Sequence, residues 1–110
     1  MRRLPVLILS VACVGLTTGV ALAQSGRVTD MAYVQGGRCV GLMSSKNLGD
    51  SDSGGFKAWL AQQSAGRPNY ILDKADEAQQ QAKRLADRAD GGSKADLIQE
   101  RDGKCSALKG

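Results

Sequence analysis

The stretch from Asn69 to Ala89 reads NYILDKADEAQQQAKRLADRA and is the longest regular pattern in the chain. Its apolar residues follow one another at steps of four and three, and four of the six are alanine. They are Ile71, Ala75, Ala78, Ala82, Leu85 and Ala89. This spacing places a heptad seam on one face of a helix of about five to six turns. Because alanine is small, the seam allows the backbone of a partner helix to come close.

A second, shorter pattern precedes it. FKAWLAQQ, residues 56–63, places Phe56, Trp59 and Leu60 on one face of a short helix. Two interpretations of Trp59 stay open. Either the three residues pack on the seam of the long helix, whose alanines provide the hollow for the indole, or Trp59 is exposed as a partner-binding residue.

The chain after the long helix predicts a return. Gly91-Gly92 is typical of a helix end, and Ser93-Lys94-Ala95-Asp96 approximates a capping box that begins another helix. That helix is interrupted at Gly103. It can pack back antiparallel and carry Cys105 toward Cys39.

The beginning of the domain is less regular. Residues 25–35 fit either a short helix or an extended piece, and Gly36-Gly37 is expected to end it. LGDSDSGG, residues 48–55, is typical of a loop. Its two aspartates, Asp50 and Asp52, lack the later acidic ligand of a calcium loop, so a solvated linker is expected. The fold class is therefore all-α, a small helical bundle with one long Ala-rich helix and an irregular N-terminal region.

Residues 1–23 have the three parts of a secretory signal. Two arginines are followed by an apolar run and by the small-x-small site Ala21-Leu22-Ala23. The mature chain is then one domain of residues 24–110 with no stable membrane anchor. An uncleaved anchor is disfavoured by the cleavage site and by the glycines and proline of the run. Lipidation at Cys13 is disfavoured because Ser10 stands where a lipobox has leucine.

Composition excludes several classes of function. The chain has 15 basic and 11 acidic residues, and removal of Arg2 and Arg3 leaves 13 basic residues against the same 11. This balance does not predict a nucleic-acid partner. There is no histidine, which removes imidazole metal sites and histidine-dependent catalysis. No enzyme activity, no metal and no cofactor is expected in the chain itself.

Two cysteines remain after export, Cys39 and Cys105, in an oxidising compartment. A structural disulfide between them would close a long loop and fasten the N-terminal region to the C-terminus. The alternative is a reactive thiol, because a basic residue precedes each cysteine. No C-x-x-C motif is present, so a thioredoxin-type site is not indicated.

Three functions remain open. The first is an exported accessory subunit that docks on a larger periplasmic protein complex through whichever apolar face is left uncovered. The candidate contact residues are Phe56, Trp59, Ala75, Ala78 and Ala82. The second is a cell-envelope structural protein that self-associates through the Ala-rich helix. The third is a thiol-based redox protein.

The layout resembles the SoxAX-binding proteins, small exported accessory subunits of bacterial thiosulfate-oxidising systems. The resemblance rests on the signal, the short mature chain, Gly37-Arg38-Cys39, the helix Phe56-Lys57-Ala58-Trp59-Leu60 and Gly103-Lys104-Cys105. It covers most of the mature chain without a diagnostic motif. It implies a non-catalytic periplasmic partner of a c-type cytochrome complex, with the haem held by that complex.

Overall fold

The structure is a computed structural model that describes residues 26–109. The predicted signal peptide, residues 1–23, and its cleavage site lie outside the described residues. The described elements are α2 (Asp30–Ser44), the short 3₁₀-helix η1 (Lys46–Leu48), α3 (Ser53–Gln62), α4 (Asn69–Arg88), α5 (Gly91–Asp102) and α6 (Lys104–Lys109). This part of the chain contains no strand, which confirms the all-α fold class.

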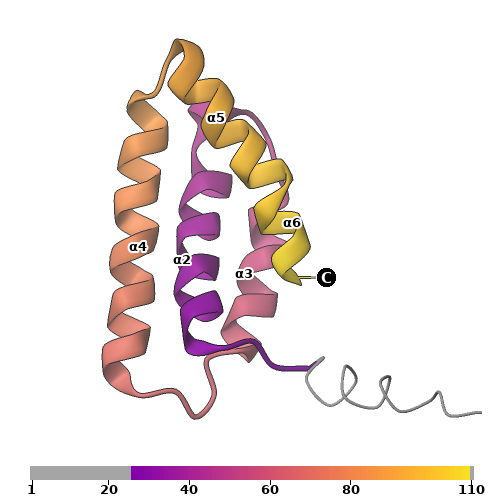
Figure 1. Ribbon diagram of the computed structural model, residues 1–110, viewed down its shortest axis with the longest axis vertical. Helices are drawn as coiled ribbons and strands as arrows, with labels where there is room; N and C mark the ends of the chain where they lie inside the picture. Colours follow the sequence, from indigo (N-terminus) through magenta and orange to yellow (C-terminus); the bar gives the residue numbers. More distant parts are fainter. Residues whose placement is uncertain (1–25, 110) are drawn as a thin grey trace, which may run out of the picture.

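Helix α2 is the centre of the domain. Figure 1 shows α4 on one side of α2, α3 on the other, and α5 with α6 crossing over α2 from the top of α4 toward α3. Helices α2 and α4 run parallel, while α3, α5 and α6 run the other way. The hydrophobic core draws on every α-helix, and its fully buried members include Val40 and Leu42 of α2.

The predicted irregular N-terminal region is wrong, because α2 is a regular helix that continues through Gly36 and Gly37. The Thr29 hydroxyl begins it by accepting a hydrogen bond from the Ala32 amide at 3.1 Å. Glycines in a helix interior cost roughly 0.5–1 kcal/mol each relative to alanine, so tertiary packing must offset this preference.

Close packing between α2 and α4 explains why Gly37 and Gly41 lie inside α2. A Cβ on Gly37 would collide with the backbone carbonyl of Ala75. A Cβ on Gly41 would collide with the Gln79 carbonyl and lie 2.9 Å from the Cβ of Ala82. The glycines of α2 therefore meet the small residues of α4 with the two backbones in contact. The predicted seam does bring a partner backbone close, and that partner is α2.

The register of α4 differs slightly from the prediction. Ile71, Ala75 and Ala82 are buried as expected, but Ala86 is buried where Leu85 was predicted, and Leu85 is 48% exposed. A straight α-helix has 3.6 residues per turn, so a buried stripe drifts away from a strict seven-residue repeat. The predicted heptad would hold only if the two helices supercoiled.

Both ends of α4 use contacts from outside the helix. Asn69 is the first helical residue, and Pro68 occupies the cap position without a side-chain hydrogen bond. At the other end, the Asn47 amide donates to the carbonyls of Ala86 and Ala89, each at 2.8 Å. These bonds satisfy carbonyls that the helix end leaves free.

Helix α3 packs on α2 and not in the predicted alanine hollow of α4. A Cβ on Gly36 would lie 2.5 Å from the Leu60 Cδ1 atom, so Leu60 fills the space that this glycine leaves open. Phe56 is buried beside the partly buried Trp59, with ring centroids 5.2 Å apart and planes tilted by 58°. Phe56 and Leu60 therefore belong to the core as one interpretation expected, while Trp59 is only partly buried against it. The space for Leu60 comes from Gly36 of α2 and not from the alanines of α4.

The C-terminal part folds back antiparallel to α4, as predicted. Gly91 has a φ of 52°, in the left-handed region, and it begins α5 two residues before the expected Ser93. Gly103 separates α5 from α6, which confirms the predicted interruption. No helix within residues 26–109 combines the length and the apolar character needed to cross a bilayer.

Candidate interaction surface

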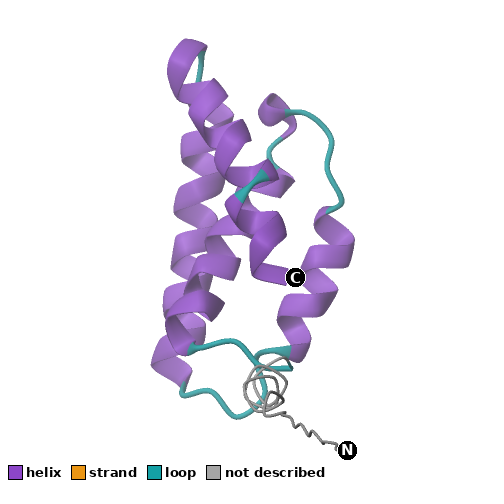
Figure 2. Cartoon of the chain, turned by 45° about the vertical axis from the view of Figure 1, so that its right-hand side comes forward, coloured by secondary structure: helices purple, strands orange, loops and turns teal. Residues whose placement is uncertain are grey.

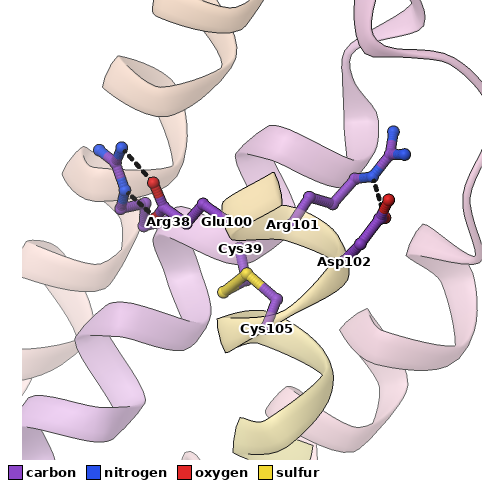
Figure 3. The surroundings of a disulfide bond; sticks show 6 residues. All are labelled: Arg38, Cys39, Glu100, Arg101, Asp102 and Cys105. Carbon is purple, nitrogen blue, oxygen red and sulfur yellow. Dashed lines mark hydrogen bonds and ion pairs between the residues drawn. A yellow bond between two sulfur atoms is a disulfide. The ribbon is translucent and has the colours of Figure 1, made fainter. Parts of the chain in front are cut away.

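The two cysteines form a disulfide between α2 and α6. Cys39 and Cys105 lie 66 residues apart in sequence, and their Cα atoms are 5.7 Å apart. Both residues are buried. Figure 3 shows the bond between the two helices. The structural interpretation is confirmed, and neither sulfur is available as a free thiol in this state. A disulfide is compatible with an oxidising, extracytoplasmic location.

The basic residue before Cys39 turns away from the sulfur. Arg38 donates from Nε to Glu100 Oε2 at 2.6 Å and from Nη2 to Oε1 at 2.9 Å (Figure 3). The hydrogen bond from Arg38 holds the pKa of Glu100 below its usual value, against the opposing effect of burial. The same bond raises the pKa of Arg38. The pair therefore fastens α5 to α2 instead of activating a thiol.

We expect Glu100→Gln to lower the free energy of unfolding by about 1 kcal/mol near neutral pH, because the pair is bidentate and only partly exposed. The folded state lowers the pKa of Glu100, so its contribution is complete above the usual value of 4.5 and is lost as the pH falls through the folded-state pKa. Urea unfolding of both proteins across the acid range measures this. A difference that stays constant with pH would contradict the expectation.

A second ion pair is built on a buried arginine, Arg67. The Arg67 side chain, 1% exposed, donates to the carboxylate of Asp30 at 2.6 Å and to the carbonyls of Val28 and Gln63, each at 2.6 Å. Its guanidinium also lies 4.9 Å from the centroid of the Tyr33 ring. This side chain joins the extended residues before α2 to the turn between α3 and α4.

Gln63 completes the same corner. Its side-chain oxygen accepts from the Val28 amide at 3.0 Å, and its side-chain nitrogen donates to the Gly26 carbonyl at 3.0 Å. The sequence reasoning missed this corner. The only signal was a basic residue and a glutamine in a short turn, which is usual for an exposed surface.

We expect Arg67→Met to lower the free energy of unfolding by about 2 kcal/mol, because methionine fills the space but leaves the buried acceptors without a donor. Chemical denaturation followed by circular dichroism measures the loss. The control is Arg84→Met on the exposed face of α4, which should change stability by less than about 0.5 kcal/mol. Equal effects of the two substitutions would contradict the role given to Arg67.

Most of the predicted contact residues are not on the surface. Phe56 is 3% exposed, and Ala75 and Ala82 are buried against α2. Ala78 and Trp59 are partly buried. Phe56, Ala75 and Ala82 are therefore wrong as exposed contact residues, because the core and α2 cover them. Trp59 and Ala78 stay predictions.

The surface instead exposes large apolar residues that the sequence reasoning did not select. Met31 of α2 is 84% exposed and Tyr70 of α4 is 63% exposed. Between the two helices lies an open, mostly apolar hollow of about 360 Å³, here called the α2–α4 groove. It is lined by Asp30, Met31, Val34, Gln35, Ile71 and Lys74. The exposed Met31 and the apolar wall of this groove make it the candidate interaction surface of the molecule.

The aspartate-rich loop has a local structural role. The Asp52 carboxylate accepts from the Gly55 amide at 2.9 Å and caps the start of α3, which begins three residues earlier than predicted. Within the described residues, no group of three or more histidine, cysteine, aspartate or glutamate side chains could hold a metal ion.

Comparison of the chain with models of protein families, with curated proteins and with solved structures found no significant match.

Proposed function

We propose that the chain is a small exported, non-catalytic accessory subunit that docks on a larger periplasmic protein complex. The single observation that carries the proposal is the exposure of Met31, 84%, in the mostly apolar α2–α4 groove. A domain this small has few large apolar residues, and within residues 26–109 it exposes three of them, Met31, Tyr70 and Leu85. Binding of a partner would remove this apolar area from water.

Two internal contacts make the other functions less suitable. The small-residue seam of α4 is occupied by α2, so self-association through that seam would require α2 to leave its place. The two cysteines are buried in one disulfide, so thiol chemistry would first require its reduction. These contacts favour a rigid binding module over a self-assembling envelope protein or a redox carrier.

The resemblance to the SoxAX-binding proteins suggests the kind of partner. On this proposal the larger complex is a c-type cytochrome of thiosulfate oxidation, and its haem belongs to the partner. The accessory chain would contribute surface and rigidity to the complex. Sulfur chemistry would take place on the cytochrome.

The test is affinity purification of the C-terminally tagged, exported chain from its own host grown on thiosulfate. We expect a larger haem-containing protein to co-purify, detected by its Soret absorption and identified by mass spectrometry. An unrelated tagged exported protein is the control. Elution of the chain as a lone species under these conditions would overturn the proposal.

A further inference from the structure

The outer face of α4 is exposed along the whole helix. Figure 1 shows α4 at one edge of the molecule, with α2 on its inner side. Four charged residues and two glutamines follow one another on the outer face, and all six are exposed. They are Asp73, Glu77, Gln80, Gln81, Arg84 and Arg88, here called the outer strip. At 100° per residue they fall within an arc of about 100°, so they form one continuous surface.

The charges of the outer strip are arranged symmetrically about its middle. Two acidic residues, Asp73 and Glu77, lie before the glutamines, and two basic residues, Arg84 and Arg88, lie after them. The spacing is the same in both directions, because each like-charged pair is four residues apart and each inner charge lies three residues from the nearer glutamine. Reversing the direction of the strip therefore exchanges an acidic for a basic residue at every charged position.

Contacts inside the molecule do not account for this arrangement. Asp73 with Glu77 and Arg84 with Arg88 are like charges four residues apart, which destabilises a helix. Within residues 26–109, none of the four makes an ion pair within 4.0 Å. The helix dipole favours acidic residues early and basic residues late, but it acts mainly in the terminal turns. Glu77 lies about two turns inside α4, beyond this effect.

We propose that two copies of this chain associate through their outer strips, with the two α4 helices antiparallel and a two-fold axis between Gln80 and Gln81. In this register Asp73 faces Arg88 of the second copy, and Glu77 faces its Arg84. The two-fold axis repeats each of these pairs, because the same patch serves on both sides of the contact. The amide groups of the glutamines lie near the axis, where each can donate and accept hydrogen bonds.

This pairing is compatible with the rest of the structure. The outer strip faces away from the small-residue seam, so the contacts of α4 with α2 stay in place. Ile71, which lines the α2–α4 groove, lies about 80° outside the arc of the strip, so the groove faces another side of α4. A two-fold pair is closed and does not grow into a filament. The inference goes beyond the accessory function and does not depend on it.

Sedimentation equilibrium of the purified mature chain tests the association. Exposed ion pairs contribute little each and are screened by salt, so we expect a weak dimer. Its dissociation constant should rise about tenfold between ionic strengths of about 0.02 M and about 0.5 M. A chain that stays monomeric at low ionic strength, up to its highest soluble concentration, would overturn the proposal.

A charge exchange tests the register. Glu77→Arg should raise the dissociation constant about tenfold or more, because it places like charges opposite each other twice, and Arg84→Glu should do the same. The double variant with both substitutions should return to within about threefold of the wild-type constant, since it rebuilds the pair with its signs exchanged. The matched controls are Asp96→Arg on α5 and Lys57→Glu on α3, which are exposed away from the strip and should leave the constant unchanged.

Circular dichroism of each variant checks that folding is intact. A dimer that neither single reversal weakens would place the contact elsewhere on the molecule and overturn the proposal. A double variant that stays as weak as the single variants would overturn the antiparallel register. A control that weakens the dimer as strongly as Glu77→Arg would mean that net charge, and not the outer strip, governs association.

Discussion

Replacing both cysteines, Cys39→Ala with Cys105→Ala, is expected to lower the free energy of unfolding by about 4 kcal/mol. The bond closes a loop between residues 66 apart in sequence, and in the chain-entropy model such a closure strongly restricts the unfolded chain. Alanine is the right replacement because both sites are buried and a serine hydroxyl would lack a partner. A small domain typically has only about 5–15 kcal/mol in total, so the variant should be near its folding limit.

Guanidinium unfolding followed by circular dichroism measures this loss. Wild-type protein with a reductant is the matched control, since it keeps both sulfur atoms and should show nearly the same stability as the double variant. A loss below about 1 kcal/mol in both would mean that the packing of α6 on α2 holds the C-terminus without the bond.

The second large effect is expected from the glycines of α2. Gly37→Ala combined with Gly41→Ala should lower the free energy of unfolding by about 3–4 kcal/mol, because each new Cβ meets the backbone of α4. The helices would have to separate, which would also loosen the contacts of Ala75 and Ala82. This loss is larger than the helix propensity that two alanines restore, at most about 2 kcal/mol.

The matched control is Gly54→Ala in α3, where a new Cβ would meet nothing within 4 Å. The same chemical change should there stabilise the protein by up to about 1 kcal/mol. Thermal unfolding of the two variants therefore should move in opposite directions. Stabilisation by both substitutions would contradict the backbone contact between α2 and α4.

Local patterns were sufficient for the second half of the fold. The long helix, the break at Gly103 and the return of Cys105 to Cys39 all follow from periodicity, turn residues and cysteine count. Each of these signals lies within the segment that it describes, or depends only on an even number of cysteines in an oxidising compartment.

The first half could not be predicted in the same way. Gly36 and Gly37 are typical of a helix end when read alone, yet they lie inside α2 because Leu60 and Ala75 need the space. Whether a glycine ends a helix or allows close packing inside one therefore depends on residues far away in sequence. Ala75 and Ala82 could not be excluded as contact residues for the same reason, since their contacts with α2 depend on Gly37 and Gly41.

The position of the disulfide also decides what a protease can remove. The chain between Cys39 and Cys105 contains α3, α4 and α5, with the turns that join them. A single cut in any of these turns adds one water and leaves both pieces covalently joined. Neither piece can diffuse away until the bond is reduced. A molecule nicked once inside the ring would thus remain one particle, whereas a cut before Cys39 or after Cys105 would release a segment.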